Sequence, residues 1–214
     1  MREPVRIPRP ASHGSSSTPG QSDAHHHRPP ATSARPARSS SVWRENLESL
    51  VWAVALALAI RTFIMAPFKI PSGSMRTTLM EGDRILVNKF IYRFHPPQHG
   101  DIIVFRYPED PKRSFIKRLV AVGGETVEIR EGKAIVNGTP LDGSGVRHSN
   151  YYYNQGQYGQ EGHAIHVPEE GFYVLGDNSA SSHDSRFWGF VPKRLVIGKA
   201  MCIFWPLTRW RVLR

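Results

Sequence analysis

Two serine side chains lie where they could do chemistry. Ser72 and Ser74 flank Gly73 within the short stretch from Pro71 to Met75. Glycine lets the backbone approach another group closely, so such a turn can present one hydroxyl while backbone N–H groups point at the same spot. A serine nucleophile with an oxyanion hole needs that arrangement. Taken alone, the pattern favours an ordinary Ser/Gly loop at the end of a helix.

A serine nucleophile needs a general base, and the sequence offers two kinds. Lys117 is one candidate, because it lies among strand-forming apolar residues. Burial in such surroundings lowers the pKa of a lysine from about 10.4 by several units, which would let the amine accept a proton. The pattern alone favours an outward-facing lysine, since side chains alternate between the faces of a strand. The histidines of this region stand in no recognisable triad motif: His95, His99, His148, His163, His166 and His183.

Length and composition limit the possible functions. The chain has 214 residues, enough for one domain with additional segments or for two small domains. Its net charge of +10 is spread along the chain, without a Lys/Arg block or zinc-finger spacing. We therefore expect no nucleic-acid partner. Cys202 is the single cysteine, so no disulfide can form within the chain.

The amino-terminal part consists of two segments of different character. Residues 1–42 are rich in Pro, Gly and Ser, which predicts a disordered tail. Residues 43–68 are predicted to form a membrane-anchoring helix, because Leu50–Ile60 are all apolar and residues 50–68 would span about 28 Å as a helix. A buried core helix and a cleaved signal peptide are the alternatives. The Arg-rich tail should stay in the cytoplasm, which places the later residues on the exported side.

From residue 69 to residue 214 the pattern is typical of β structure. Short runs of β-branched and aromatic residues are bounded by turn signals, which predicts a mostly β fold with an antiparallel sheet as the catalytic domain. Asn137-Gly138 beside an alternating strand predicts a hairpin. We expect a small inserted β-ribbon region at about 131–170, in which the order of residues 142–162 stays open. The predicted strands lie at 85–87, 102–105, 118–122, 127–129, 134–136, 172–175 and 195–204.

Four short motifs follow the apolar stretch in order. They are Pro71–Met75 with Thr78-Leu79, then Gly82-Asp83 with Ile85–Lys89, then Tyr107-Pro108 with Phe115–Arg118, and last Gly176–Asn178 with Asp184–Arg186, Trp188-Gly189 and Val191-Pro192. In order and spacing they resemble the motifs of bacterial type I signal peptidases (leader peptidases), which are serine proteases with a Ser-Lys dyad. The resemblance covers residues 50–210. It implies a membrane-bound endopeptidase that removes N-terminal signal peptides from exported preproteins.

The resemblance also implies a role for each matched polar residue. Ser74 would be the nucleophile and neutral Lys117 the general base, in a reaction that passes through an acyl-enzyme. Ser72 would donate a hydrogen bond to the oxyanion, beside the backbone N–H of Ser74. Ser182 would orient the lysine by a hydrogen bond. No metal and no cofactor is needed for this chemistry.

The specificity implied by the resemblance is a small-X-small (Ala-X-Ala) site, with small residues at P1 and P3 of the substrate. Asp184 and Arg186 match a structural ion pair that supports the site. The implied partners are signal-peptide-bearing preproteins and the lipid bilayer of the bacterial inner membrane, crossed once with the amino terminus in the cytoplasm. The side chains that would line the P1 and P3 pockets are Phe68, Ile70, Leu79 and Ile116.

The sequence departs from the family's pattern in several places, and one membrane segment is visible where many relatives have two. Two departures are substitutions within the motifs. Thr77 stands where the family usually has proline, and Ser179-Ala180 stands where the last motif often has Arg-Asp. Neither change touches the Ser74–Lys117 pair. Three alternatives stay open: another Ser-Lys protease related to self-cleaving repressors, a membrane-anchored β-domain that binds envelope partners without catalysis, and an organellar relative with a transit peptide. The sequence does not indicate the oligomeric state.

Overall fold

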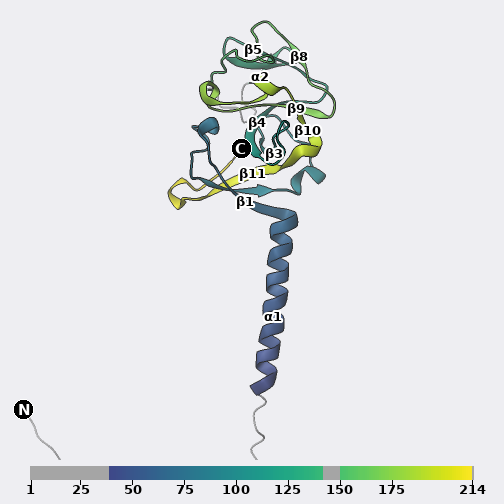
Figure 1. The fold of residues 1–214 in the computed structure, drawn as a ribbon, viewed down its shortest axis with the longest axis vertical. Coiled ribbons are helices and arrows are strands. Elements are labelled where there is room, and N and C mark those ends of the chain that lie inside the picture. The colour runs from purple at the N-terminus through teal and green to yellow at the C-terminus, as the bar shows by residue number, and fades with distance from the viewer. Residues whose placement is uncertain (1–38, 142–149, 214) are drawn as a thin grey trace, which may run out of the picture. The chain divides into compact units, whose positions relative to one another are not determined.

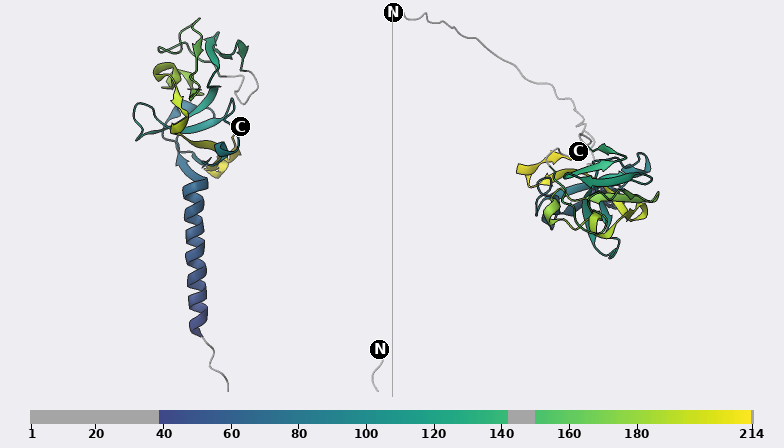
Figure 2. Two further views of the ribbon diagram at one scale, coloured as in Figure 1. Left: turned by 90° about the vertical axis from the view of Figure 1, so that its right-hand side faces the viewer. Right: turned by 90° about the horizontal axis from the view of Figure 1, so that it is seen from above.

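The computed structural model describes residues 39–141 and 150–213, without the side chains of residues 39–42 and 63. Within these ranges the chain after residue 64 folds into two antiparallel sheets (Figure 1). The predicted fold class, mostly β with antiparallel pairing, is therefore confirmed. In Figure 1 and in the left view of Figure 2, the smaller sheet lies at one end of the β domain, and β1 and β11 lie at the other end.

The larger sheet has the strand order β1-β2-β11-β3-β4-β9-β10, and β12 pairs with β11. Its central strand β3 carries four consecutive buried apolar residues, which is expected of a strand that is covered on both faces. The strands of this sheet are β1 (Met65–Lys69), β2 (Arg84–Asn88), β3 (Ile102–Arg106), β4 (Ser114–Val122), β9 (Gly171–Leu175), β10 (Val191–Pro192), β11 (Val196–Trp205) and β12 (Arg211–Val212).

The smaller sheet has the order β7-β6-β5-β8 and begins earlier than the ribbon region predicted at about 131–170. Asn137 and Gly138 connect β6 to β7 with φ values of 50° and 78°, so the hairpin predicted from this dipeptide is confirmed. Within residues 142–162, residues 142–149 lie outside the described residues. The strands are β5 (Thr126–Arg130), β6 (Lys133–Val136), β7 (Thr139–Pro140) and β8 (Ile165–His166).

The structure corrects the helix predicted for residues 43–68. Helix α1 (Ser39–Ala59) is followed by one π-helical turn, η1 (Ile60–Ile64), and then by strand β1. Pro67 explains the change, because proline lacks the N–H that a helix interior needs, whereas an edge strand tolerates it.

Two other expectations concern this amino-terminal part. In the described ranges, no helix combines the length and the apolar character that a membrane crossing requires. The disordered tail predicted for residues 1–42 lies outside the described residues, except that its last four residues belong to α1.

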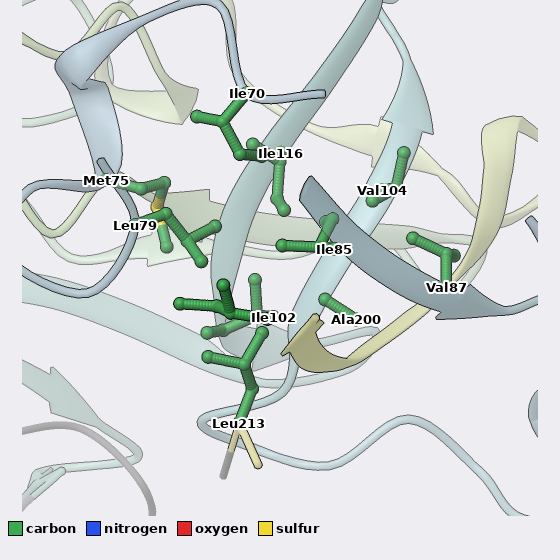
Figure 3. Packing of buried hydrophobic residues seen from close by; sticks show 11 residues of the cluster. Ile70, Met75, Leu79, Ile85, Val87, Ile102, Val104, Ile116, Ala200 and Leu213 are labelled. Atoms are coloured by element: carbon green, nitrogen blue, oxygen red, sulfur yellow. The ribbon is translucent and has the colours of Figure 1, made fainter. Parts of the chain in front are cut away.

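One buried cluster of the larger sheet supports the loop that carries Ser74. Met75 and Leu79 are fully buried in this cluster, in which Ile70 and Ile102 also take part (Figure 3). Burying a side chain of this size stabilises a fold by about 1.5–3 kcal/mol. Met75 and Leu79 therefore anchor the chain on both sides of the turn at residues 76–78, just after Ser74.

Candidate active site

Ser74 and Lys117 come together from two separate elements. Ser74 lies in the 3-10 helix η2 (Gly73–Met75), and Lys117 lies in β4 opposite Ile103 of β3. The Nζ of Lys117 donates a hydrogen bond of 2.6 Å to the Oγ of Ser74. Both residues are buried, with 7% and 4% of their surfaces exposed. The lysine therefore faces inward, contrary to what the alternation pattern alone favoured.

Burial changes the protonation of this lysine. Loss of contact with water lowers the pKa of Lys117 from 10.5 to about 8, against the opposing attraction of the Asp184 and Asp177 carboxylates. The Arg186 guanidinium adds a smaller lowering. With a pKa of about 8, roughly a tenth of the amine is neutral at pH 7, and only the neutral amine can accept a proton.

The Ser74 loop is held against the chain that follows β9. The backbone N–H of Asn178 donates to the carbonyl oxygen of Ser74 over 3.0 Å, and its Nδ2 donates to the carbonyl of Gly73 over 3.0 Å. Gly176 allows this approach, because a Cβ there would lie 2.6 Å from the Ser74 carbonyl oxygen. The loop position thus depends on Gly176 and Asn178, which both stand in the last matched motif but were assigned no role from the sequence.

Ser182 packs against the same glycine. A Cβ on Gly176 would lie 2.1 Å from the Oγ of Ser182, and Ser182 is 5% exposed. Its buried Oγ makes no hydrogen bond within the part of the chain that the structure describes. The hydrogen bond by which Ser182 was predicted to orient Lys117 is therefore not formed in this structure, and the role stays a prediction.

Asp184 and Arg186 form a fully buried ion pair. The Nε of Arg186 donates to Oδ1 of Asp184 over 2.8 Å, and both side chains are 0% exposed. The guanidinium also donates to the Oγ and the carbonyl oxygen of Ser179. The other carboxylate oxygen of Asp184 accepts from the N–H of Gly176 over 3.0 Å. This pair thus connects the loop after β9 to the short helix α2 (Ser185–Trp188).

A second buried ion pair was not predicted from the sequence. Arg118 donates to Asp177 through Nε over 2.7 Å and through a terminal nitrogen over 2.6 Å, and both side chains are 1% exposed. The hydroxyl of Thr78 donates to the same carboxylate. All three residues belong to the matched motifs. Only the register that sets Arg118 opposite Leu175 brings the arginine to the end of β9.

Two adjoining hollows lie along the buried Ser74–Lys117 pair. The larger is a cleft of about 440 Å³ to which Ser72, Ser74 and Lys117 all contribute. Ser72 is exposed there, and its side chain makes no capping bond to η2. The smaller hollow, of about 30 Å³, is lined by three of the four predicted pocket residues, namely Phe68, Ile70 and Ile116. The fourth, Leu79, is fully buried in the core and lines neither hollow.

An unpaired strand edge borders this cleft. Strand β9 pairs with β4 only from Arg118 onward, whereas β3 pairs with β4 from Ser114. One edge of β4 pairs with β3 and the other with β9. On the β9 edge, residues 114–117 have no partner among the described strands. Such an edge offers backbone hydrogen bonds to an extended peptide.

A serine hydroxyl held by a buried lysine amine, beside a cleft with an open strand edge, fits a serine endopeptidase. The comparison with known proteins agrees, because the model of the family "Signal peptidase, peptidase S26" matches residues 43–205. The chain belongs to this family and is a serine endopeptidase. This finding favours the enzyme over the non-catalytic β-domain.

Several relatives carry the name signal peptidase I. The protein of Leptolyngbya laminosa is 41% identical, over 85% of this chain and 89% of its own. A probable signal peptidase I-1 of a Synechocystis strain is 42% identical, over 78% of this chain and 85% of its own. The crystal structure of a signal peptidase I from Enterococcus faecalis has 34% sequence identity and a TM-score of 0.40, covering 49% of this chain and 97% of its own.

Proposed function

We propose that this protein removes N-terminal signal peptides from exported preproteins and cuts after a small-X-small site such as Ala-X-Ala. The observation that carries the proposal is the 2.6 Å hydrogen bond from Lys117 to Ser74 in a buried site. The names of the relatives support the choice of substrate.

The proposed reaction proceeds through an acyl-enzyme. Neutral Lys117 accepts the proton of Ser74 as the Ser74 oxygen attacks the carbonyl carbon of the scissile bond. The protonated lysine then gives that proton to the leaving amine, and the acyl group stays on Ser74. Lys117 next takes a proton from a water molecule, whose oxygen attacks the carbonyl carbon of the ester. As the bond between the acyl carbon and the Ser74 oxygen breaks, the protonated lysine returns this proton to the Ser74 oxygen, which releases the carboxylic acid product and restores the serine and the neutral amine.

Ser72 is proposed to stabilise the oxyanion of both steps. Its backbone is extended, with φ −135° and ψ 155°, and its hydroxyl borders the cleft that also contains Ser74. A donor of this kind typically contributes about 10²–10³ in rate. Asp184 and Arg186 are proposed to support the site structurally, and Ser182 to orient Lys117 once a substrate is bound.

The small hollow supports the proposed preference for small residues. A volume of about 30 Å³ bounded by the apolar side chains of Phe68, Ile70 and Ile116 suits a small substituent such as a methyl group. Apolar walls also favour alanine over a polar residue of similar size. Leu79 would act behind this wall, as part of the core that fixes its shape.

We further propose that the apolar stretch from Leu50 onward attaches the protein to the bacterial inner membrane, with the catalytic domain on the exported face. Supporting this, α1 exposes a series of large apolar side chains, among them Leu50, Val51, Trp52, Val54, Leu56 and Leu58. Resistance to extraction by alkaline carbonate, together with protection of an amino-terminal tag from external protease, would be the expected result. Release of the full-length protein by carbonate would contradict the attachment.

The catalytic proposal is tested with the full-length protein and a precursor that bears an Ala-X-Ala site. Ser74→Ala and Lys117→Ala should each abolish cleavage, measured by mass spectrometry of the products, while circular dichroism stays unchanged. Lys112→Ala is the matched control, because Lys112 is exposed and lines neither hollow. Wild-type rates in either dyad variant would refute the assignment.

A further inference from the structure

The ionisable side chains along the two hollows are all basic residues. Arg113, Lys117 and His183 line the larger cleft, and Lys69 lines the smaller hollow. Within the described residues, no Asp or Glu side chain lines either one. A peptide that enters this cleft therefore meets positive charge without a compensating carboxylate on the walls.

Arg113 is held firmly at the end of this wall. Its backbone N–H donates to Asp110, and its carbonyl accepts from the N–H of Tyr107 over 2.9 Å. Its guanidinium lies over the rings of Phe115 and Tyr107, 5.3 and 5.9 Å from their centroids. These two rings are themselves stacked, 4.5 Å apart. Packing on aromatic faces fixes an arginine without using its N–H donors.

The nearest carboxylates along the chain are engaged by other groups. Glu109 accepts the hydroxyl of Tyr107, and Asp110 accepts the backbone N–H of Lys112 over 3.2 Å. In the described part of the chain, Arg113 forms no ion pair. The guanidinium therefore borders the cleft with its donors available to a substrate.

The position of Arg113 relative to the dyad sets which substrate residue it would meet. Arg113 precedes Lys117 by four positions, which corresponds to about 13 Å along a strand. Between them, Ser114, Phe115 and Ile116 border both hollows. The path from Lys117 to Arg113 therefore follows the wall that is proposed to hold P1 and P3. An extended substrate would place its fourth to sixth residue before the scissile bond near the guanidinium.

We propose that Arg113 is a specificity-determining residue that binds an acidic side chain of the precursor, four to six residues before the scissile bond. This inference rests on the proposed function and adds a second determinant to the small-X-small site. Arg113 is exposed, so water screens its charge and the effect is moderate. Added salt should weaken it further.

The test uses the full-length protein and peptides that share one Ala-X-Ala site. Each of the fourth, fifth and sixth residues before the scissile bond is set in turn to Glu, Gln or Lys, and kcat/KM is measured at low salt. At one of these positions the wild type should prefer Glu to Lys by about tenfold, with Gln between them. Arg113→Gln should reduce this ratio to about one, and Arg113→Lys should keep part of it.

Lys112→Gln provides the matched control, because it removes the same charge from a neighbouring exposed residue that lines neither hollow. It should leave the Glu-to-Lys ratio as in the wild type. The inference is overturned if the wild type shows no preference at these positions, if the preference survives in Arg113→Gln, or if Lys112→Gln loses it equally. Failure of the proposed function gives a different result from failure of the Arg113 inference. In that case the wild type and Ser74→Ala would cut the Gln peptides equally.

Discussion

The Nζ of Lys117 donates a 2.6 Å hydrogen bond to the Oγ of Ser74, across 43 residues of sequence. The next residue, Arg118, is buried as well, yet its electrostatic situation is the opposite. Burial works against its charge, but hydrogen bonds to Asp177 raise the pKa of Arg118. Lys117 has a hydroxyl as its partner in place of a carboxylate, and its pKa is lowered. Adjacent strand residues thus provide one fixed charge and one amine that can lose its proton.

The pH dependence of activity follows from this difference. With the pKa of Lys117 at about 8, the neutral fraction of the amine rises about tenfold per pH unit below that value and levels off above it. We expect kcat/KM to rise about tenfold from pH 6 to pH 7 and to be nearly constant above pH 9. Initial rates on an Ala-X-Ala peptide in buffers of constant ionic strength measure this. A flat profile between pH 6 and pH 9 would contradict a lysine base.

The same pKa makes stability depend on pH. Because the folded pKa lies below the unfolded value of 10.5, the unfolded chain binds more protons between about pH 8 and pH 10.5. The wild type should therefore gain stability as the pH rises through this window. Lys117→Met removes the buried amine at similar volume and should be more stable at pH 7, by on the order of 2 kcal/mol. The gain should shrink towards pH 10.

Urea unfolding of both proteins at pH 7 and at pH 10, followed by tryptophan fluorescence, measures this difference. Lys112→Met serves as the control for a change of charge, since the Lys112 side chain is exposed. The stability difference between Lys112→Met and the wild type should be the same at both pH values. Equal stabilities of the wild type and Lys117→Met at both pH values would show that the amine carries no burial cost.

Most strands were predictable because their local signals agree with their environment. The run from Ile102 to Phe105 is apolar throughout because β3 is covered on both faces, and Asn137-Gly138 adopts the dihedral angles that its hairpin needs. The end of the first helix was missed, because an apolar run fits a helix and a strand equally well. Pro67 was the signal that could have placed the break.

The site was predictable only where a motif could be matched. Ser72, Ser74 and Lys117 stand in such motifs, and the structure places them around one cleft. The pairing of Arg118 with Asp177 spans 59 residues and depends on the register of β4 against β9, which no local pattern encodes.

The Arg118–Asp177 pair should be one of the most sensitive positions of the fold. Asp177→Asn leaves the arginine charge buried without its full counter-charge, which typically costs about 3–5 kcal/mol. It also weakens the bond from Thr78, which lies in the Ser74 loop. We expect a clearly lowered midpoint of urea unfolding. The double variant Arg118→Met/Asp177→Leu should be less destabilised, because it removes both charges. A double variant less stable than Asp177→Asn would contradict this account.

Gly176 should control the geometry of the dyad without taking part in the chemistry. In Gly176→Ala, the new Cβ would lie 2.1 Å from the Ser182 Oγ and 2.6 Å from the Ser74 carbonyl oxygen, so the Ser74 loop has to move. A displacement of about 1 Å in a catalytic group can cost about 100-fold in rate, and we expect kcat/KM to fall by about that factor. The double variant Gly176→Ala/Ser182→Gly removes the contact with Ser182 and keeps the contact with Ser74. It should therefore recover only part of the activity. Wild-type activity in Gly176→Ala would mean that the loop can shift without disturbing the Lys117–Ser74 hydrogen bond.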